Sequence, residues 1–389
     1  MEGGLQEHQP EVRHRAAQIT IAIIIFLCML VVIDGLLHFT HLRGYLTQTV
    51  PPEYAPRDSD VLFKIAPNFP TTTHHMLDAA YPFWSNSRGC FDREHDPDAV
   101  TVYITGDSFT WGFTPLEDKW TTKFGEVFDV PVAKCGVLGY GTKQELEKSK
   151  DDLADFTNTK LIVLAYYEND IFDDAWLLRE RDGLKEKTFS ACSEKSGPSR
   201  WSGVKCFLSH NSILYVFSYS LLSSVVWNAL PEPYASSIVT FISPTFPPQI
   251  KLTKQDFEFH RNNIREFKKL ADEHDAVLLI LRIPSKEEIA GGATMERYAG
   301  IRSNIEQVLQ EERILYFDVA PELDRYSTNV PLYWERDLHL NVAGNRILGL
   351  LLSRFVAEQG LIPLVNRDAI LQSVREQLAS ITNKDAKSE

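Results

Sequence analysis

The chain has 389 residues, of which 44% are hydrophobic and 24% are charged. This composition is ordinary for a globular protein, and the length is enough to bury a sizeable core. The formal net charge of −13, without any Lys/Arg-rich run, argues against non-specific nucleic-acid binding, which needs basic patches that neutralise phosphates. The sequence also lacks the cysteine spacing that is typical of a zinc site.

Residues 17–38 predict a membrane-spanning helix. Nearly every residue from Ile19 to Leu37 is apolar, which is about the length that a helix needs to cross a bilayer. Arg13 and Arg15 precede this run and favour a cytoplasmic location for residues 1–16. A cleaved signal peptide is the alternative, but the run is long and no small-x-small cleavage site follows it. We therefore expect a single-pass signal anchor, with the rest of the chain extracytoplasmic, in the periplasm or outside the cell.

The cysteines fit an exported domain. Cys28 lies in the membrane run, and the remaining four permit three disulfide pairings. Cys192 with Cys206 would close a short polar loop, and Cys90 with Cys135 would tie the segment before the first strand to a later glycine loop. Four free thiols in a reducing compartment are the alternative. The anchor favours the oxidising side of the membrane.

Residues 39–98 are rich in proline and polar residues and predict an irregular connecting segment. Residues 99–362 then predict a domain of alternating strands and helices. Five apolar runs predict its strands: Val100–Ile104, Val130–Cys135, Leu161–Ala165, Ala276–Ile283 and Ile314–Asp318. Helices are expected at Lys143–Phe156, from Lys254 onward, at Glu296–Gln310 and at Val342–Glu358. Such alternation predicts a mainly parallel sheet covered on both faces, with its site at the carboxyl ends of the strands.

Residues 172–250 interrupt the alternation and predict an insertion. Its stretch Ile213–Leu230 is hydrophobic enough to suggest a second membrane span, but several serines weaken that interpretation. A single span there would also place Ser108 and His339 on opposite sides of the membrane. We therefore expect a helix of the insertion. Residues 363–389 predict a polar helix followed by a charged tail.

Ser108 follows the first predicted strand at the point where a helix is expected to begin. A serine there could attack a carbonyl while its own backbone N–H helps to hold the resulting oxyanion. Gly139, in a loop with two further glycines, could point its N–H at a ligand because glycine allows close approach of the backbone. Asn169, at the end of the third strand, could donate its side-chain amide. The structural alternatives are a helix cap for Ser108, an ordinary turn for Gly139, and a cap or an Asx turn for Asn169.

Asp337 and His339 lie two residues apart, just before an apolar helix. Histidine is the natural general base for a serine, and a nearby carboxylate can fix its tautomer and stabilise the imidazolium. The alternative is that Asp337 caps the helix. Each of these motifs is weak alone. Together they supply a nucleophile, oxyanion donors, a base and an orienting acid, which is the inventory for attack on an ester.

The motifs Gly106-Asp107-Ser108-Phe109, Gly136-Val137-Leu138-Gly139, Asn169-Asp170 and Asp337-Leu338-His339 resemble, in this order, those of the SGNH hydrolases, also called the GDSL esterase/lipase family. The resemblance covers about residues 100–358. It implies a flavodoxin-like, three-layer α/β/α fold with a five-stranded sheet, with Ser108 as nucleophile, His339 as base and Asp337 as acid. It also implies an oxyanion hole made by the Ser108 and Gly139 backbone N–H groups and the Asn169 side chain. No metal or cofactor is implied.

Three features depart from the common pattern of that family. Many members place the acid three residues before the histidine, where this chain has Arg336. The Asp-x-His spacing and the segment Ile283–Glu288 resemble a branch that includes alginate-type polysaccharide O-acetyltransferases. Glu168 also stands where a small residue is expected. The sequence therefore leaves open whether the acyl acceptor is water or a sugar hydroxyl. It also leaves open whether a membrane acyltransferase is a partner.

These features predict a membrane-anchored, exported serine esterase or O-acyltransferase that acts on a small acyl ester, such as acetyl, of a carbohydrate. The alternative is a non-catalytic envelope protein that binds glycan with the same cleft. Trp176 and Trp201 lie in polar stretches of the insertion and are predicted to contact the substrate. Packing in a core is the other explanation for aromatic residues of this segment.

Overall fold

The computed structural model describes residues 9–40, 53–76, 78–181, 251–291, 294–364 and 366–385, and, within the long middle excursion, residues 204, 207–208, 211–218 and 221–222. The chain divides into two compact units. The first comprises Met1–Thr49, His75–Leu77 and Glu186–Gln249, and the second comprises Val50–His74, Asp78–Lys185 and Ile250–Glu389. The second unit contains all of the predicted catalytic residues.

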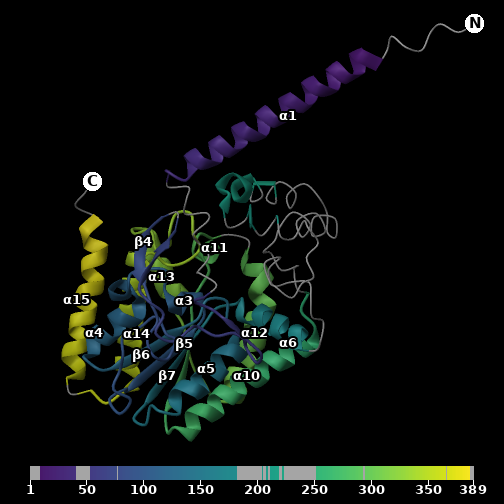
Figure 1. Cartoon of the computed structure of the whole chain (residues 1–389). Coiled ribbons are helices and arrows are strands. Elements are labelled where there is room, and N and C mark those ends of the chain that lie inside the picture. Colours follow the sequence, from purple (N-terminus) through teal and green to yellow (C-terminus); the bar gives the residue numbers. More distant parts are fainter. Residues whose placement is uncertain are drawn as a thin grey trace, which may run out of the picture. The chain divides into compact units, whose positions relative to one another are not determined.

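The first unit contains the predicted apolar helix. Helix α1 spans Gln9–Leu37, and its part Ala17–Leu37 is long and apolar enough to cross a membrane, with none of that stretch buried by the rest of the chain (Figure 1). Near its end, the Asp34 carboxylate accepts a hydrogen bond of 2.8 Å from the Leu214 N–H. Residues 213–218 are helical, as expected, and most of the remaining stretch to Leu230 lies outside the described residues.

The second unit is built on a five-stranded parallel sheet, which confirms the predicted fold class. Each strand begins and ends within two residues of a predicted run. The strands are β5 (Val102–Gly106), β6 (Val132–Gly136), β7 (Leu161–Tyr166), β8 (Val277–Arg282) and β9 (Leu315–Asp318). Their order in the sheet is β6-β5-β7-β8-β9, and every neighbouring pair is parallel. This is the flavodoxin-like order.

The strand order places a topological switch point beside β5. The chain passes from β5 to β6 on one side and then crosses over to β7 on the other side of β5. The connections that leave the carboxyl ends of β5 and β7 therefore diverge, and ligands of open α/β sheets bind in the crevice at such points. Ser108 directly follows β5, and Asn169 follows β7.

Helices cover both faces of the sheet, which confirms the three layers (Figure 1). Side chains of each strand alternate between two cores, so that Val102 and Val163 face one core while Tyr103 and Ile162 face the other. The first core includes helices α4 (Trp120–Phe128), α14 (Val342–Gln359) and α15 (Arg367–Asp385). The second includes α5 (Thr142–Leu153), α10 (Lys254–Glu273) and α12 (Thr294–Glu311).

The connecting segment is more ordered than the sequence suggests, which corrects the prediction of an irregular stretch. It forms two small two-stranded sheets, β1 (Arg57–Asp58) with β2 (Leu62–Phe63) and β3 (Thr72–His75) with β4 (Ala80–Phe83). Aromatic packing explains this order, because Tyr54 and Phe83 are buried and the Trp111 indole donates to the Tyr54 hydroxyl at 3.0 Å. Strands of two to four residues are too short to show a period in the sequence.

Helix α6 (Asp170–Arg181) extends the sheet domain beyond the predicted start of the insertion at residue 172. It contacts α10, and Ala175 and Leu177 are fully buried. The second unit continues to Lys185 and resumes at Ile250, so the excursion is shorter than the sequence indicates. The helix also contains many charged residues, which make its apolar side hard to recognise in the sequence.

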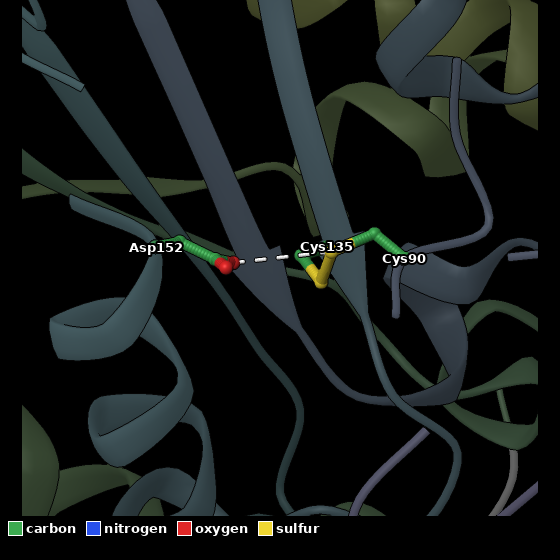
Figure 2. Close-up of side chains that lie close together, drawn as sticks. All are labelled: Cys90, Cys135 and Asp152. Atoms are coloured by element: carbon green, nitrogen blue, oxygen red, sulfur yellow. Dashed lines mark hydrogen bonds between the residues drawn. A yellow bond between two sulfur atoms is a disulfide. The ribbon is translucent and has the colours of Figure 1, made fainter. Parts of the chain in front are cut away.

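A disulfide joins Cys90 to Cys135, one of the pairings expected from the sequence (Figure 2). It links the connecting segment to β6, the strand that leads into the glycine loop, and closes a loop of 45 residues. Constraint of the unfolded chain by a loop of this length contributes about 4 kcal/mol. Asp152 Oδ2 lies 3.9 Å from Cys90 Sγ and accepts a hydrogen bond from the Tyr103 hydroxyl. Cys192 and Cys206 lie outside the described residues.

Export can be tested through the redox state of these cysteines. Both Cys90 and Cys135 are buried, so the chain must be alkylated in denaturant, with no reductant added. We expect Cys28 to be modified and Cys90 and Cys135 to stay unmodified until a reductant is supplied, as peptide masses will show. Full modification of all cysteines without reductant would contradict both the disulfide and the oxidising location.

Candidate active site

Ser108 is positioned by a tight connection between β5 and the short helix α3 (Ser108–Trp111). The backbone at Gly106 has a φ of +155°, and an added Cβ there would lie 2.3 Å from Thr110 Oγ1 and 2.8 Å from the Ala165 carbonyl oxygen. Only glycine fits that close approach. Asp107 caps the helix by accepting a hydrogen bond of 2.9 Å from the Phe109 N–H. Ser108 is therefore held rigidly and stays partly exposed.

His339 is positioned by the loop between α13 (Ala320–Ser327) and α14. An antiparallel bridge pairs Tyr333 with Leu340, and the Trp334 N–H donates to the His339 carbonyl at 3.0 Å. The cap of α14 is Asn341, whose side chain accepts from the Gly344 N–H at 2.9 Å. The structural alternative for Asp337, that it caps this helix, is therefore wrong.

A chain of hydrogen bonds connects Ser108, His339 and Asp337. His339 Nε2 lies 2.8 Å from Ser108 Oγ, and His339 Nδ1 lies 2.6 Å from Asp337 Oδ1. The same carboxylate oxygen accepts from the His339 backbone N–H at 2.8 Å. Burial raises the pKa of Asp337, but hydrogen bonding to His339 and the charges of His339 and His74 outweigh burial and leave that pKa below its usual value.

The lowered pKa of Asp337 favours the ionised carboxylate, and an ionised carboxylate implies one direction for these hydrogen bonds. An ionised carboxylate can only accept, so His339 Nδ1 must carry the hydrogen that it donates to Asp337. In a neutral imidazole the other ring nitrogen is then an acceptor. The Ser108 hydroxyl therefore donates to His339 Nε2, which is the arrangement that a general base needs to remove the serine proton.

Phe113 holds the imidazole ring and was not predicted from the sequence. Its ring stacks on that of His339, with centroids 3.8 Å apart and planes inclined by 8°. Phe113 has a φ of +38°, which is uncommon for a bulky residue, and its carbonyl accepts from the Trp334 indole at 3.2 Å. A contact between a helix end and a loop more than two hundred residues later leaves no periodic signal in the sequence.

The glycine loop lies against the serine segment. The Val137 N–H donates to the Gly106 carbonyl at 3.0 Å, and a Cβ on Gly136 would come within 2.1 Å of the Trp111 nitrogen. Gly139 is exposed, has a φ of +71° and has no atom within 4 Å of an added Cβ. Its backbone therefore borders open space at the same edge of the sheet as Ser108.

Asn169 lies beside the serine segment, partly exposed, at the end of β7. Its side-chain amide donates to Asp173 Oδ2 at 2.9 Å and also hydrogen-bonds the Asp107 carboxylate. An amide nitrogen carries two hydrogens, so these two carboxyl groups account for both of them. The structure thus brings the four predicted motifs to one edge of the sheet.

The two tryptophans that were predicted to contact substrate have different outcomes. Trp176 lies in α6 and is only 8% exposed, so its ring is not presented to solvent as a stacking surface. This burial favours the alternative explanation, packing in a core. Trp201 lies outside the described residues, and its contact with substrate stays a prediction.

Glu168, the residue that departs from the common family pattern, belongs to a buried ion network. Its carboxylate accepts from Arg282, which is 1% exposed and also pairs with Asp318 and Glu288. Burial lowers the pKa of Arg282, but these carboxylates outweigh it and raise the pKa overall. The network fixes the residue that precedes Asn169 to the carboxyl end of β8.

Three buried carboxyl groups and a partly exposed one lie under the glycine loop and Asn169. They are Asp107, Glu145, Asp170 and Asp173, and in each the pKa is raised, first by burial and, in all but Asp107, next by the negative charge of neighbouring acids. Both carboxyl oxygens of Glu145 lack a hydrogen-bond partner among the described residues. A raised pKa lowers the negative charge that these groups place beneath a developing oxyanion.

Replacement of Glu145 by glutamine is expected to stabilise the fold at alkaline pH. In the unfolded chain Glu145 ionises near its ordinary pKa, whereas in the fold it keeps its proton to higher pH. The folded state therefore binds the extra proton above the ordinary pKa, and stability falls by about 1.4 kcal/mol per pH unit until the raised pKa is reached. Glutamine mimics the protonated acid and removes this dependence.

Thermal unfolding at pH 5 and pH 8 tests this expectation. The melting temperature of Glu145→Gln should exceed that of the wild type more at pH 8 than at pH 5, by about 2–4 °C for each kcal/mol. Glu126→Gln, at a largely exposed position of α4, serves as the matched control and should leave the pH dependence unchanged. Parallel pH profiles for all three proteins would show that Glu145 is ionised in the fold.

Within the described part of the chain, one group of side chains has ligand atoms spaced as in a metal site. It consists of Cys90, Cys135 and Asp152. The two sulfurs are bonded to each other, so neither is the thiolate that a metal would need. The group does not fit a metal ion while the disulfide is intact.

The fold was compared with known proteins. No protein-family model matches the chain, and no curated protein matches it. Similar solved structures include an α/β hydrolase enzyme from the metagenome of Lake Arreo, Spain, at 12% identity over 68% of this chain and 97% of that one, with a TM-score of 0.39.

Two further structures illustrate the likeness. An acetylxylan esterase from Geobacillus stearothermophilus matches at 13% identity over 68% of this chain and 97% of that one, with a TM-score of 0.36. A GDSL-like lipase from Bacteroides thetaiotaomicron VPI-5482 matches at 11% identity over 67% and 88%, with a TM-score of 0.34. With identities and TM-scores this low, the likeness assigns neither a family nor an activity to this chain.

Proposed function

We propose that this chain is a membrane-anchored serine esterase or O-acyltransferase, which transfers a small acyl group through a covalent intermediate on Ser108. The observation that carries the proposal is the hydrogen-bonded chain from Ser108 Oγ through His339 to Asp337, with distances of 2.8 and 2.6 Å. Three residues from two distant segments meet at a topological switch point with the geometry of a nucleophile, a base and an orienting acid.

In the first half of the reaction, His339 Nε2 takes the proton of the Ser108 hydroxyl as Ser108 Oγ attacks the acyl carbon. The bond to the leaving alkoxy oxygen then breaks, and the imidazolium returns the proton to that oxygen. Asp337 stabilises the imidazolium that forms between these two steps. The product is an alcohol and an ester of Ser108.

In the second half, water or a sugar hydroxyl gives its proton to His339 and attacks the acyl-serine. The imidazolium gives this proton to Ser108 Oγ as the bond between that oxygen and the acyl carbon breaks, which restores the free enzyme, with a carboxylic acid as product in hydrolysis and a new ester in transfer. The oxyanion in both halves would be held by the Ser108 and Gly139 backbone N–H groups and by the side-chain amide of Asn169, which would have to turn from its carboxylate partners toward the oxyanion.

The substrate class and the location belong to the same proposal. The apolar helix Ala17–Leu37 would anchor the chain, with the catalytic unit on the extracytoplasmic side. The disulfide between Cys90 and Cys135 supports that side of the membrane. An acetyl ester of an envelope carbohydrate is the proposed substrate, since the Asp-x-His spacing resembles that of polysaccharide O-acetyltransferases.

Turnover of a chromogenic acetyl ester by the purified full-length chain in detergent tests the activity. Acetate release with water alone would identify a hydrolase, and appearance of acetylated oligosaccharide when a glycan is added would identify a transferase. Binding of glycan without any turnover of either kind would contradict the proposal in favour of the non-catalytic alternative.

A further inference from the structure

Helix α11 (Lys286–Ile289) brings a lysine beside the loop that carries the proposed acid. The helix begins directly after β8, where the Ser285 hydroxyl accepts from the Glu288 N–H at 3.1 Å. Pro284, one residue earlier, accepts a hydrogen bond of 2.7 Å from the Tyr333 hydroxyl. The Tyr333 hydroxyl thus attaches the start of the loop Tyr333–Leu340 to the segment that follows β8.

The Lys286 ammonium group donates to three backbone carbonyls of this loop. Its Nζ lies 2.5 Å from the Trp334 oxygen, 2.8 Å from the Glu335 oxygen and 3.2 Å from the Asp337 oxygen. An ammonium group has three N–H donors, so all of them are used within one stretch of four residues. Hydrogen bonds from a charged donor are also about twice as strong as neutral ones.

Two other hydrogen bonds restrain the loop between its two ends: the Arg336 N–H donates to the Asp78 carboxylate at 3.1 Å, and the Trp334 indole donates to the Phe113 carbonyl at 3.2 Å. The bridge between Tyr333 and Leu340 closes it at the base, while Glu335, Arg336 and Leu338 are exposed. A carboxylate on such a stretch has many orientations, yet Asp337 Oδ1 must accept from both the ring and the backbone of His339. The Lys286 ammonium group hydrogen-bonds the carbonyls of Trp334, Glu335 and Asp337 and so limits the orientations of the Asp337 side chain.

The short helix that carries Lys286 is held by the buried ion network. Glu288, two residues along the same helix, pairs with Arg282, and Arg282 also pairs with Glu168 beside Asn169. The backbone from which the Lys286 side chain extends is therefore tied to the sheet and to the residue that precedes Asn169. Each of these contacts joins described residues of the second unit.

We propose that Lys286 is a positioning residue that holds the Asp337 loop so that the carboxylate meets His339. This inference rests on the proposed function. It assigns Lys286 no contact with substrate, because its three donors are already engaged by the loop. Removal of the ammonium group should therefore slow the chemical steps and leave binding of the ester unchanged.

The test compares kcat and KM for acetyl ester turnover in wild-type protein and Lys286→Met. We expect kcat to fall about 10- to 100-fold, as misplacement of an orienting group does, while KM stays within about twofold. Lys123→Met is the matched control, since this lysine of α4 pairs only with Glu126 on the same helix among the contacts described, and its kcat should equal that of the wild type. Lys286→Gln keeps an amide group with two N–H donors and should have an intermediate kcat. It takes the place of Lys286→Met in the test if the methionine variant unfolds.

A double-mutant cycle with Asp337→Asn separates positioning from a general structural effect. If Lys286 acts through Asp337, Lys286→Met will lower kcat in the wild-type background and leave the already reduced kcat of Asp337→Asn unchanged. Equal reductions in the two backgrounds would overturn the inference, as would an unchanged kcat in Lys286→Met. Absence of turnover in the wild type, in contrast, would overturn the proposed function and the inference with it.

Discussion

Ser108→Ala is expected to remove nearly all ester turnover and to leave the fold unchanged. The substitution removes the nucleophile but exposes no buried surface, because Ser108 Oγ contacts His339 at the open edge of the sheet. We expect kcat to fall by at least about 10³-fold, with residual catalysis from binding and the oxyanion donors alone. Steady-state kinetics of the purified variant measure this effect, and thermal unfolding verifies the fold.

The matched control is Ser327→Ala, at a partly exposed serine of α13 whose hydroxyl donates to the Asp324 carbonyl within the same helix. Its kcat should equal that of the wild type. Turnover by Ser108→Ala at a rate close to the wild type would exclude Ser108 as nucleophile and would leave the hydrogen-bonded chain without a catalytic function.

Asp337→Asn is expected to produce the second largest loss. An amide in this position can donate to His339 Nδ1 and so favour the tautomer in which Nε2 carries the hydrogen and cannot accept the serine proton. The imidazolium that forms in the reaction would also lose its counter-charge. Together these effects should lower kcat by about 10³- to 10⁴-fold with little change in KM.

Asp324→Asn and Asp318→Asn test whether an acid other than Asp337 orients His339. Asp324 is exposed on α13, and Asp318 pairs with Arg282, so neither contacts His339 in the structure. Asp324→Asn should retain wild-type kcat. If Asp337→Asn retains it as well, the carboxylate is not needed for catalysis, and a serine–histidine dyad becomes the better description.

The fold was predictable because the sheet is buried on both faces. Runs such as Leu161–Ala165 are apolar throughout, and a continuous apolar run between polar segments is a strong signal for a strand of a parallel sheet. The connecting segment gave no such signal. Its order depends on tertiary aromatic contacts of Trp111 with Tyr54 and Phe83, and periodicity cannot reveal partners that far apart.

The site was predictable to the extent that each motif is local. Ser108 and Asn169 follow apolar strands, which predicted them at one edge of the sheet, while Asp337 and His339, two residues apart, were assigned to the same site through the resemblance of the combined motifs. Phe113 and Lys286 act through contacts that only the folded chain creates. The stack of Phe113 on His339 needs a strained backbone, and the three bonds of Lys286 need a loop of backbone carbonyls, which carry no sequence signature.

The central claim is that His339 activates Ser108 for attack on an acyl carbon. Covalent labelling by a serine-directed fluorophosphonate, followed by peptide mass spectrometry, tests it most directly, since the reagent reacts with serines that are activated as nucleophiles. We predict one adduct, on the peptide that contains Ser108, and its loss in a folded His339→Ala variant. An adduct on another residue, or equal labelling of Ser108 with and without His339, would contradict the account.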